Sequence, residues 1–341
     1  MRFPKFLNDN GVIGFVAPSF GCNIEPYKSA FDNAQKKLAA LGHTFDIGPN
    51  CYAGEGIGIS NTPQKCGEEL TDYYCSDNND VLISCGGGEL MCETMDYVDL
   101  EKIRNAKPKW YMGYSDNTNF TFLLTTLCDV ASFYAPCAAA FGMEPWHESI
   151  SDAYDLLRGK KDCVKGYEKW EKESLKDEAH PLMPYNLTET KILKTFLNHK
   201  FSGRIIGGCM DVIANLVGTN FDNVKNFNEK YKEDGIIWFF ESCELNVMTI
   251  RRVLWNMEHA GWFKYVKGFI FGRPMLFGTE QMDMMGLDEY NAVTELLKKY
   301  NVPIIMDADI GHLPPMMPVM CGSYATVEVK DNNISMKMEC R

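Results

Sequence analysis

Three short segments carry residue types that could together perform nucleophilic catalysis, and the first surrounds a serine. Ser115 lies in Trp110–Thr118, between a continuous apolar run and a helix-forming stretch. A serine at such a turn projects its hydroxyl above the carboxyl edge of a parallel sheet, where open α/β folds bind ligands. The helix behind it offers free N–H groups and a positive dipole end. The segment predicts a nucleophile, although it lacks the Gly-x-Ser-x-Gly pattern. The alternative is that Ser115 or Asp116 is only an N-cap.

The second segment is a run of three glycines, Gly86–Gly88, directly after the apolar run Val81–Cys85. Consecutive glycines let the backbone approach a ligand closely, and one of their N–H groups could stabilise an oxyanion. A phosphate or dinucleotide loop is the rival interpretation. It lacks both Gly-x-Gly-x-x-Gly and a Gly-Lys-Ser/Thr ending. A plain turn is the third interpretation.

The third feature is a histidine and a carboxylate that each follow an apolar run. His312 comes after Pro303–Met306 and a glycine, and a histidine on a rigid loop at a strand end suits a general base. The alternative is a purely structural histidine. Glu241 closes the run Gly235–Phe240, and a buried carboxylate is costly unless it is paired, so its position indicates a function. Glu244 is more readily a solvated residue of the next helix.

Alternating strand-like and helix-like segments precede and position the nucleophile. Thr62 and Pro63 are typical of a helix start, and Gly42 is typical of a helix end. The alternation predicts a mainly parallel sheet with helices on both sides, an N-terminal doubly wound, Rossmann-like α/β domain over residues 1–140. The expected strands are Val12–Pro18, His43–Ile47, Val81–Cys85 and Trp110–Tyr114, and the expected helices are Tyr27–Leu41, Thr62–Cys75 and Asn117–Leu127.

Residues 141–200 differ, because they include a highly charged stretch with few aliphatic side chains, 159–180. They predict a linker or insertion that could serve as a lid. Apolar runs return after Arg204, with one clear helix, Val247–Ala260, that ends at Gly261. Residues 201–341 therefore predict a β-rich, mixed C-terminal domain that carries Glu241 and His312. Its expected strands are Gly235–Phe240, Val266–Phe271, Pro303–Met306 and Thr326–Val329.

The composition excludes several classes of protein. Apolar residues make up 45% and charged residues 23% of the chain, which is ordinary for a globular protein. The net charge of −12 argues against nucleic acid or an anionic membrane as a partner. No run approaches the ~20 apolar residues of a membrane span, and the first apolar run is too short for a signal peptide, so a cytoplasmic protein is expected. The 13 scattered cysteines contain no C-x-x-C pair, which predicts reduced thiols and no metal site.

In their order along the chain, these segments resemble the LD-carboxypeptidases together with the microcin C self-immunity proteins. The resemblance spans nearly the whole chain. It rests on Val16–Ser19, Thr62–Leu70, Val81–Gly88, Gly113–Thr118, Gly207-Gly208, Leu216–Thr219, Glu241, Gly272–Pro274 and Asp309–His312.

The resemblance implies a serine peptidase with a Ser115–Glu241–His312 triad and an oxyanion hole formed by the N–H of Asp116 and that of Gly87 or Gly88. It also implies two domains with the site between them, a homodimer, and no metal or organic cofactor. The chain departs from the family at Ser242, where an acid such as Asp is common. The third glycine, followed by Glu89, leaves the register of the oxyanion donor open, and Glu89 itself is a candidate substrate-binding residue.

The insertion is longer than a plain murein LD-carboxypeptidase would need, and it resembles the self-immunity branch. That branch cleaves the amide that joins a peptidyl aspartate to a nucleotide-like phosphoramidate. Trp170 could stack on a nucleobase, or it could only pack within its own loop. A small peptide or peptidyl-nucleotide substrate is expected. Two alternatives stay open: a murein tetrapeptide LD-carboxypeptidase in peptidoglycan recycling, and a non-catalytic relative that binds a peptide or a nucleotide.

Overall fold

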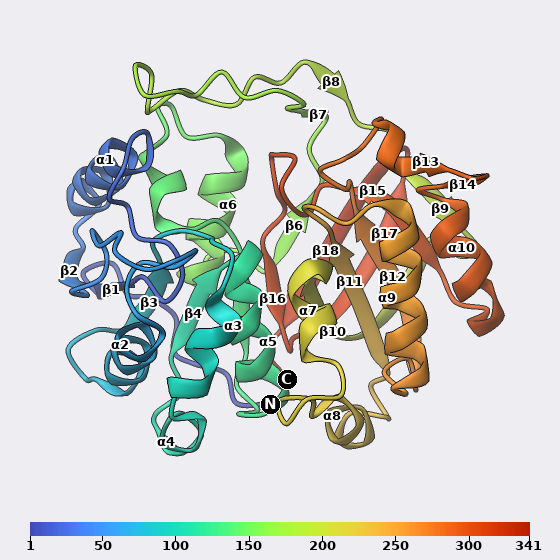
Figure 1. Ribbon diagram of the computed structural model, residues 1–341, viewed down its shortest axis with the longest axis horizontal. Helices are drawn as coiled ribbons and strands as arrows, with labels where there is room; N and C mark the ends of the chain where they lie inside the picture. The colour runs from blue at the N-terminus through green and yellow to red at the C-terminus, as the bar shows by residue number, and fades with distance from the viewer. The chain divides into compact units, whose positions relative to one another are not determined.

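The computed structural model describes residues 1–341, which divide into two compact units (Figure 1). The first unit comprises Met1–Asp162, Glu173–Leu187 and Met317–Cys321, and the second comprises Cys163–Lys172, Thr188–Met316 and Gly322–Arg341. The segment 141–200 thus contributes to both units. It also contains a helix that the sequence analysis did not predict, α6 (Glu148–Leu157).

The first unit is built on a six-stranded sheet, and its mainly parallel character confirms the predicted fold class. The sheet order is β16-β5-β4-β3-β1-β2, and every neighbouring pair is parallel except β16 with β5. The chain runs from β1 to β2 on one side and returns to β3 on the other, so β1 and β3 flank a topological switch point. The strands are β1 (Val12–Val16), β2 (Thr44–Ile47), β3 (Val81–Ser84), β4 (Trp110–Gly113), β5 (Ser132–Tyr134) and β16 (Val319–Cys321).

The helices of the first unit begin and end where local chemistry favours it. The Thr62 hydroxyl accepts a hydrogen bond from the Lys65 N–H, with Pro63 as the first helical residue. Gly42 follows the end of the preceding helix, α1, and has φ of 101°. The α-helices are α1 (Tyr27–Ala40), α2 (Pro63–Cys75), α3 (Met91–Thr94), α4 (Leu100–Asn105), α5 (Thr118–Thr126) and α6, and the 3₁₀ helices are η1 (Met95–Tyr97), η2 (Ser115–Asn117) and η3 (Ala138–Gly142).

The second unit contains an eight-stranded mixed sheet in the order β6-β18-β17-β10-β11-β12-β15-β9. Its four central strands β10, β11, β12 and β15 are parallel, and the outer strands are antiparallel to their neighbours. This confirms the mixed, strand-rich C-terminal part. The strands are β6 (Cys163–Lys165), β9 (Lys194–Phe196), β10 (Lys200–Cys209), β11 (Ile236–Glu241), β12 (Val266–Gly272), β15 (Ile304–Ala308), β17 (Tyr324–Lys330) and β18 (Asn333–Glu339).

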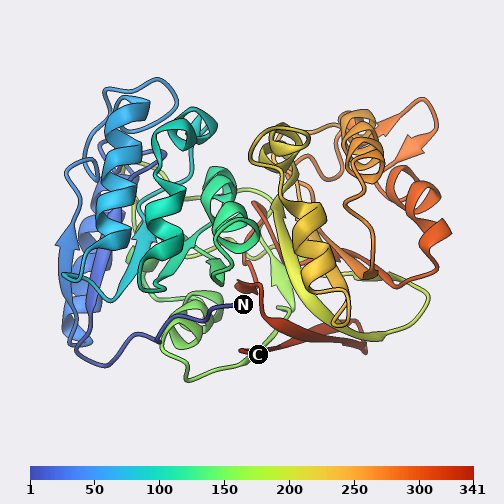
Figure 2. The same cartoon turned by 90° about the horizontal axis from the view of Figure 1, so that it is seen from below.

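Helices and two small antiparallel strand pairs complete the second unit. Figure 2 shows the helices of each unit beside that unit's own strands. None of the helices in either unit combines the length and the apolarity needed to cross a lipid bilayer. The remaining elements are α7 (Met210–Leu216), α8 (Val224–Lys230), α9 (Val247–His259), α10 (Asn291–Leu297), η4 (Glu280–Met282), η5 (Lys298–Tyr300), and the antiparallel pairs β7 (Lys169–Trp170) with β8 (Glu189–Thr190) and β13 (Asp283–Met284) with β14 (Leu287–Asp288).

Strand β11 lies in the core of the second unit, which explains why its residues before Glu241 are all apolar. Every residue of β11 is buried, as expected of a central parallel strand covered on both faces. Trp238 stacks on Trp262 with ring centroids 5.6 Å apart, and Phe240 stacks on Trp238 at 5.4 Å. The aromatic packing therefore holds β11 and positions its last residue, Glu241.

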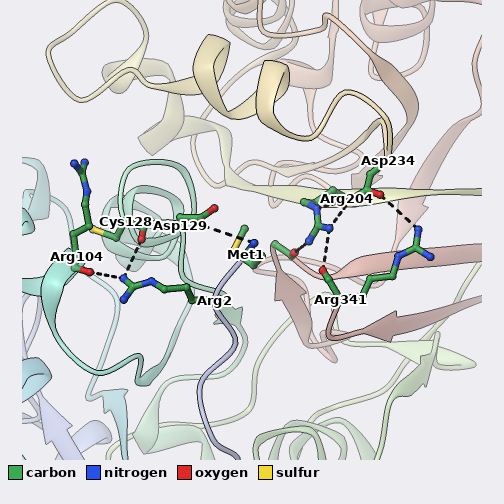
Figure 3. A network of polar contacts seen from close by, with 9 residues as sticks. Met1, Arg2, Arg104, Cys128, Asp129, Arg204, Asp234 and Arg341 are labelled. Atoms are coloured by element: carbon green, nitrogen blue, oxygen red, sulfur yellow. Dashed lines mark hydrogen bonds and ion pairs between the residues drawn. The ribbon is translucent and has the colours of Figure 1, made fainter.

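The two ends of the printed sequence are each held within one unit (Figure 3). In the first unit, the guanidinium of Arg2 donates to the carbonyls of Arg104 and Cys128. In the second, Arg204 pairs with Asp234 at 2.5 Å and donates to the carbonyl of Arg341 at 2.9 Å. Arg2 is thus held by α4 and the turn after α5, and Arg341 is held by strand β10.

Candidate active site

One group of candidate site residues lies at one edge of the first unit's sheet. Ser19 follows β1, Gly86–Gly88 follow β3, and Ser115 follows β4. Because β1, β3 and β4 are adjacent and parallel, their carboxyl ends meet at the same edge. This edge lies at the topological switch point, where open sheets of this kind bind ligands.

Ser115 adopts a backbone conformation that is rare for residues other than glycine. Its φ is 62°, in the left-handed region, which costs on the order of 1 kcal/mol for a non-glycine residue. Its N–H donates to the Tyr134 hydroxyl at 3.3 Å, and its carbonyl accepts from the Thr118 hydroxyl at 2.6 Å. Neither Ser115 nor Asp116 caps the following helix with its side chain, so the N-cap interpretation is wrong.

The glycine turn packs directly on Ser115. A methyl group at Gly87 would lie 3.2 Å from both Cβ and Oγ of Ser115. Gly88 has φ of 156°, and a side chain there would collide with the Ser19 hydroxyl. The N–H groups of Gly87 and Asp116 have no acceptor within the protein. Close approach of bare backbone with unpaired donors is the arrangement that an oxyanion hole requires.

The buried carboxyl group of Asp116 connects the loops that carry these candidate residues of the first unit. Its Oδ2 accepts from the Ser19 hydroxyl at 2.5 Å and from the Met91 N–H at 2.9 Å, and its Oδ1 accepts from the Asn119 amide at 3.0 Å. Burial raises the pKa of Asp116 to about 6, although these hydrogen bonds lower it. The side chain thereby joins the loops after β1, β3 and β4. Sequence reasoning missed the Ser19 partner, whose signal is its position just after a buried strand.

A second group of candidate residues, within the second unit, is a part-buried pair of side chains at the ends of its strands. Glu241 ends β11 with 1% of its surface exposed. Its Oε2 lies 2.7 Å from Nδ1 of His312, on the loop after β15. Burial lowers the pKa of His312, but the Glu241 carboxylate and Cys243 together raise it more, so the pKa is well above its ordinary value. A carboxylate at Nδ1 fixes the tautomer that presents Nε2 as the base.

Two glycines allow Glu241 to sit against backbone. A methyl group at Gly311, which has φ of 114°, would lie 2.6 Å from Oε2 of Glu241. A methyl group at Gly272 would collide with the carbonyl of Ile310 and lie 3.1 Å from Cβ of Glu241. Glu244 is exposed, as expected, while Ser242 is buried.

Other residues expected near the site have different surroundings. Glu89 is exposed, and its N–H donates to the carbonyl of Gly58. Trp170 is only 4% exposed. The Arg273 guanidinium lies 4.7 Å from the centre of its ring, and the Phe277 ring stands perpendicular to it at 5.8 Å. Trp170 is therefore buried by packing, but against residues outside the insertion rather than within its own loop alone.

His43 lies in the core of the first unit, away from the candidate residues after β1, β3 and β4. It is buried, with Nε2 at 2.7 Å from the Tyr154 hydroxyl and Nδ1 at 3.0 Å from the Gly11 carbonyl. Both ring nitrogens are thus used in the core of the first unit. Tyr154 belongs to helix α6, which the sequence analysis did not predict, so this partner could not be expected.

Comparisons with known proteins agree on one family. The LD-carboxypeptidase N-terminal domain matches residues 13–135, and the LD-carboxypeptidase C-terminal domain matches residues 202–327. The microcin C7 self-immunity protein MccF of Escherichia coli is 25% identical over 81% of this chain and 79% of its own length.

Solved structures of similar proteins share the fold. An MccF-like protein from Bacillus anthracis superimposes with a TM-score of 0.82 at 22% identity, covering 99% of this chain and 100% of that one. MccF in complex with aspartyl sulfamoyl adenosine superimposes with a TM-score of 0.81 at 21% identity, covering 99% of both chains. At these identities the likeness describes the fold alone.

Proposed function

Because the chain belongs to the LD-carboxypeptidase family, we propose that it is a serine-type peptidase or amidase that uses Ser115, His312 and Glu241 as a triad. The observation that carries the proposal is the part-buried hydrogen bond between Glu241 and His312. A carboxylate that orients an imidazole is the hallmark of a general base prepared to activate a hydroxyl. The left-handed turn at Ser115 and the unpaired N–H groups beside it supply further support.

In the proposed reaction, Ser115 Oγ attacks the carbonyl carbon of the scissile amide while His312 Nε2 accepts the hydroxyl proton. The carbonyl oxygen becomes an oxyanion, which the N–H groups of Asp116 and of Gly87 or Gly88 stabilise. The imidazolium then gives its proton to the leaving amine as the C–N bond breaks. Water attacks the acyl-enzyme by the same route and restores the serine. Glu241 keeps the imidazole oriented and balances its charge.

We propose a peptidyl-aspartyl nucleotide-type toxin as the substrate. Support comes from the relatives, which are named for microcin self-immunity and were solved with aspartyl sulfamoyl adenosine. A murein tetrapeptide remains the second candidate, because the matched family is named for LD-carboxypeptidase activity. A non-catalytic peptide- or nucleotide-binding relative is the third. We further propose that the protein is cytoplasmic and forms a homodimer. Light scattering on the purified protein tests the oligomeric state.

Mass spectrometry of two parallel reactions tests the function. One contains murein tetrapeptide and the other contains aspartyl sulfamoyl adenosine, each incubated with wild type, Ser115→Ala and the control Ser151→Ala. Ser151 lies on α6 and has no role in the proposed chemistry. Loss of terminal D-alanine would indicate murein recycling, and cleavage of the adenylate would indicate detoxification. A product that persists in Ser115→Ala, or no product in either reaction while both ligands bind, would overturn the proposed triad.

A further inference from the structure

A buried ionic cluster lies just before the histidine loop, and the proposed reaction does not use it. The cluster consists of Lys191, Arg273 and Asp309, all within the second unit and each no more than 3% exposed. Arg273 donates to Oδ1 of Asp309 at 2.6 Å, and Nζ of Lys191 lies 3.4 Å from Oδ2. Burying three charges is expensive, and removing one partner from such a cluster is more so.

The cluster joins the highly charged insertion to the loop that carries His312. The N–H of Tyr167, within the insertion (residues 141–200), donates to Oδ2 of Asp309 at 2.8 Å. Lys191, near its end, donates its backbone N–H to the carbonyl of Glu168 and its Nζ to Oδ1 of Asn333. Two separate segments of the insertion, at Tyr167 and at Lys191, thus meet at a single carboxylate.

Further contacts extend this anchoring to both sides of His312. The N–H of Glu171 donates to the carbonyl of Pro314 at 2.7 Å, two residues after His312. Arg273 donates to the carbonyl of Asp307 at 2.7 Å and lies over the Trp170 ring. The loop 309–312 is therefore fixed by the cluster at its first residue and by Glu241 at its last.

Gly166 shows how closely the insertion fits this cluster. A methyl group on Gly166 would lie 2.7 Å from Oδ2 of Asp309 and 2.7 Å from Nζ of Lys191. Its φ is not in the left-handed region, so the conflict is one of space alone. An alanine there would push on the ion pair while leaving all three charges in place.

We propose that Asp309 is a positioning residue for His312. Through Lys191 and the Tyr167 backbone, the insertion holds Asp309 and so helps to position His312. The insertion is then more than a cover or a linker, because its attachment sets the geometry of the histidine. The consequence for catalysis rests on the proposed function. The positioning role itself does not rest on the proposed function, since it concerns only the position of the imidazole.

The test compares Lys191→Met with Lys169→Met, which makes the same substitution at an exposed lysine of the same insertion. The first readout is the histidine NMR spectrum, with the low-field Nδ1 proton of His312 assigned by its loss in His312→Asn. We expect that signal to shift or broaden in Lys191→Met and in Gly166→Ala, and to remain unchanged in Lys169→Met. Gly166→Ala serves where Lys191→Met fails to fold, as judged by circular dichroism.

The second readout is turnover of whichever substrate the wild type cleaves. We expect kcat to fall by about 10- to 100-fold in Lys191→Met with KM within about twofold, because the base is misplaced while the binding surface remains. An unchanged His312 signal in both folded variants would overturn the inference. If the wild type cleaves neither substrate, the proposed function fails, and the NMR comparison still decides the positioning role.

Discussion

The Nδ1 atom of His312 lies 2.7 Å from Oε2 of Glu241, although 71 residues separate them in the chain. Both residues stand at the carboxyl ends of parallel strands, β11 and β15, with β12 between them. The parallel sheet brings the distant segments together, and two glycines leave room for the carboxylate. The pair is the most specific chemical feature of the second unit.

Replacing Glu241 by glutamine should separate orientation from charge. The amide can still accept a hydrogen bond but no longer stabilises an imidazolium, so the pKa of His312 should fall from its raised wild-type value. We expect kcat to fall by about 10²- to 10⁴-fold, and the acidic limb of kcat/KM to move to lower pH. Glu244→Gln, at an exposed position, is the control. A glutamine variant with an unshifted acidic limb would exclude His312 as the group that titrates there.

The glycine turn offers a matched pair of substitutions. Gly87→Ala would crowd Ser115 at 3.2 Å, whereas a methyl group at Gly86 would come no nearer than 3.3 Å to the carbonyl of Phe20. We expect Gly87→Ala to lower kcat by about 10- to 100-fold through displacement of the hydroxyl or the oxyanion donor, and Gly86→Ala to have a small effect. Steady-state kinetics on both variants provide the check. Equal losses would indicate that the turn has only a structural role.

The raised pKa of Asp116 predicts how stability depends on pH. The pKa is about 6 in the folded protein, against an ordinary value of 3.8, so the unfolded chain ionises first and wild-type stability falls as pH rises from about 4 to 6. Asp116→Asn has no such loss. Its gain in unfolding free energy over wild type should grow by up to about 3 kcal/mol across that range. Urea denaturation at pH 4 and pH 7.5 measures the difference, and a difference that shrinks with rising pH would contradict the buried-carboxylate account.

Trp170 allows stacking on a nucleobase to be distinguished from internal packing. Its ring is buried between Arg273 and Phe277, so Trp170→Ala should lower the unfolding free energy by about 3–5 kcal/mol. Trp170→Phe should cost less, and it should weaken binding of aspartyl sulfamoyl adenosine no more than binding of a base-free aspartyl sulfamate. Calorimetric titration of both ligands gives the comparison. A loss confined to the adenosine ligand would restore the stacking role.

The sequence predicted those elements whose signals are local. The helix over residues 62–75 carries its own start signal at Thr62 and Pro63, and β11 is a continuous apolar run. Helix α6 was missed, because its amphipathic pattern is short and is followed by a densely charged stretch. Strand β16 could not be assigned to the first unit, because its pairing with β5 joins residues nearly 190 positions apart, and no local pattern records such a partner.

The candidate site shows the same division. Ser115 and Glu241 stand directly after an apolar run and His312 follows one on a short loop, which made all three recognisable in the sequence. Asp309 was visible only as part of a motif, because its partner Lys191 lies in a segment that looks solvated. Nothing in the composition around Lys191 shows that this lysine is buried. Long-range ionic contacts of this kind become readable only once the fold is known.

The placement of β16 limits how the protein can be divided into fragments. The chain passes between the two units five times, at residues 162/163, 172/173, 187/188, 316/317 and 321/322. A fragment cut after the last strand of the first parallel set would lack Val319–Cys321 and would expose the fully buried strand β5 as an edge. Unpaired apolar edges of this kind recruit other chains and aggregate. No single cut therefore yields two soluble halves, and a split version would have to return residues 317–321 to the first unit.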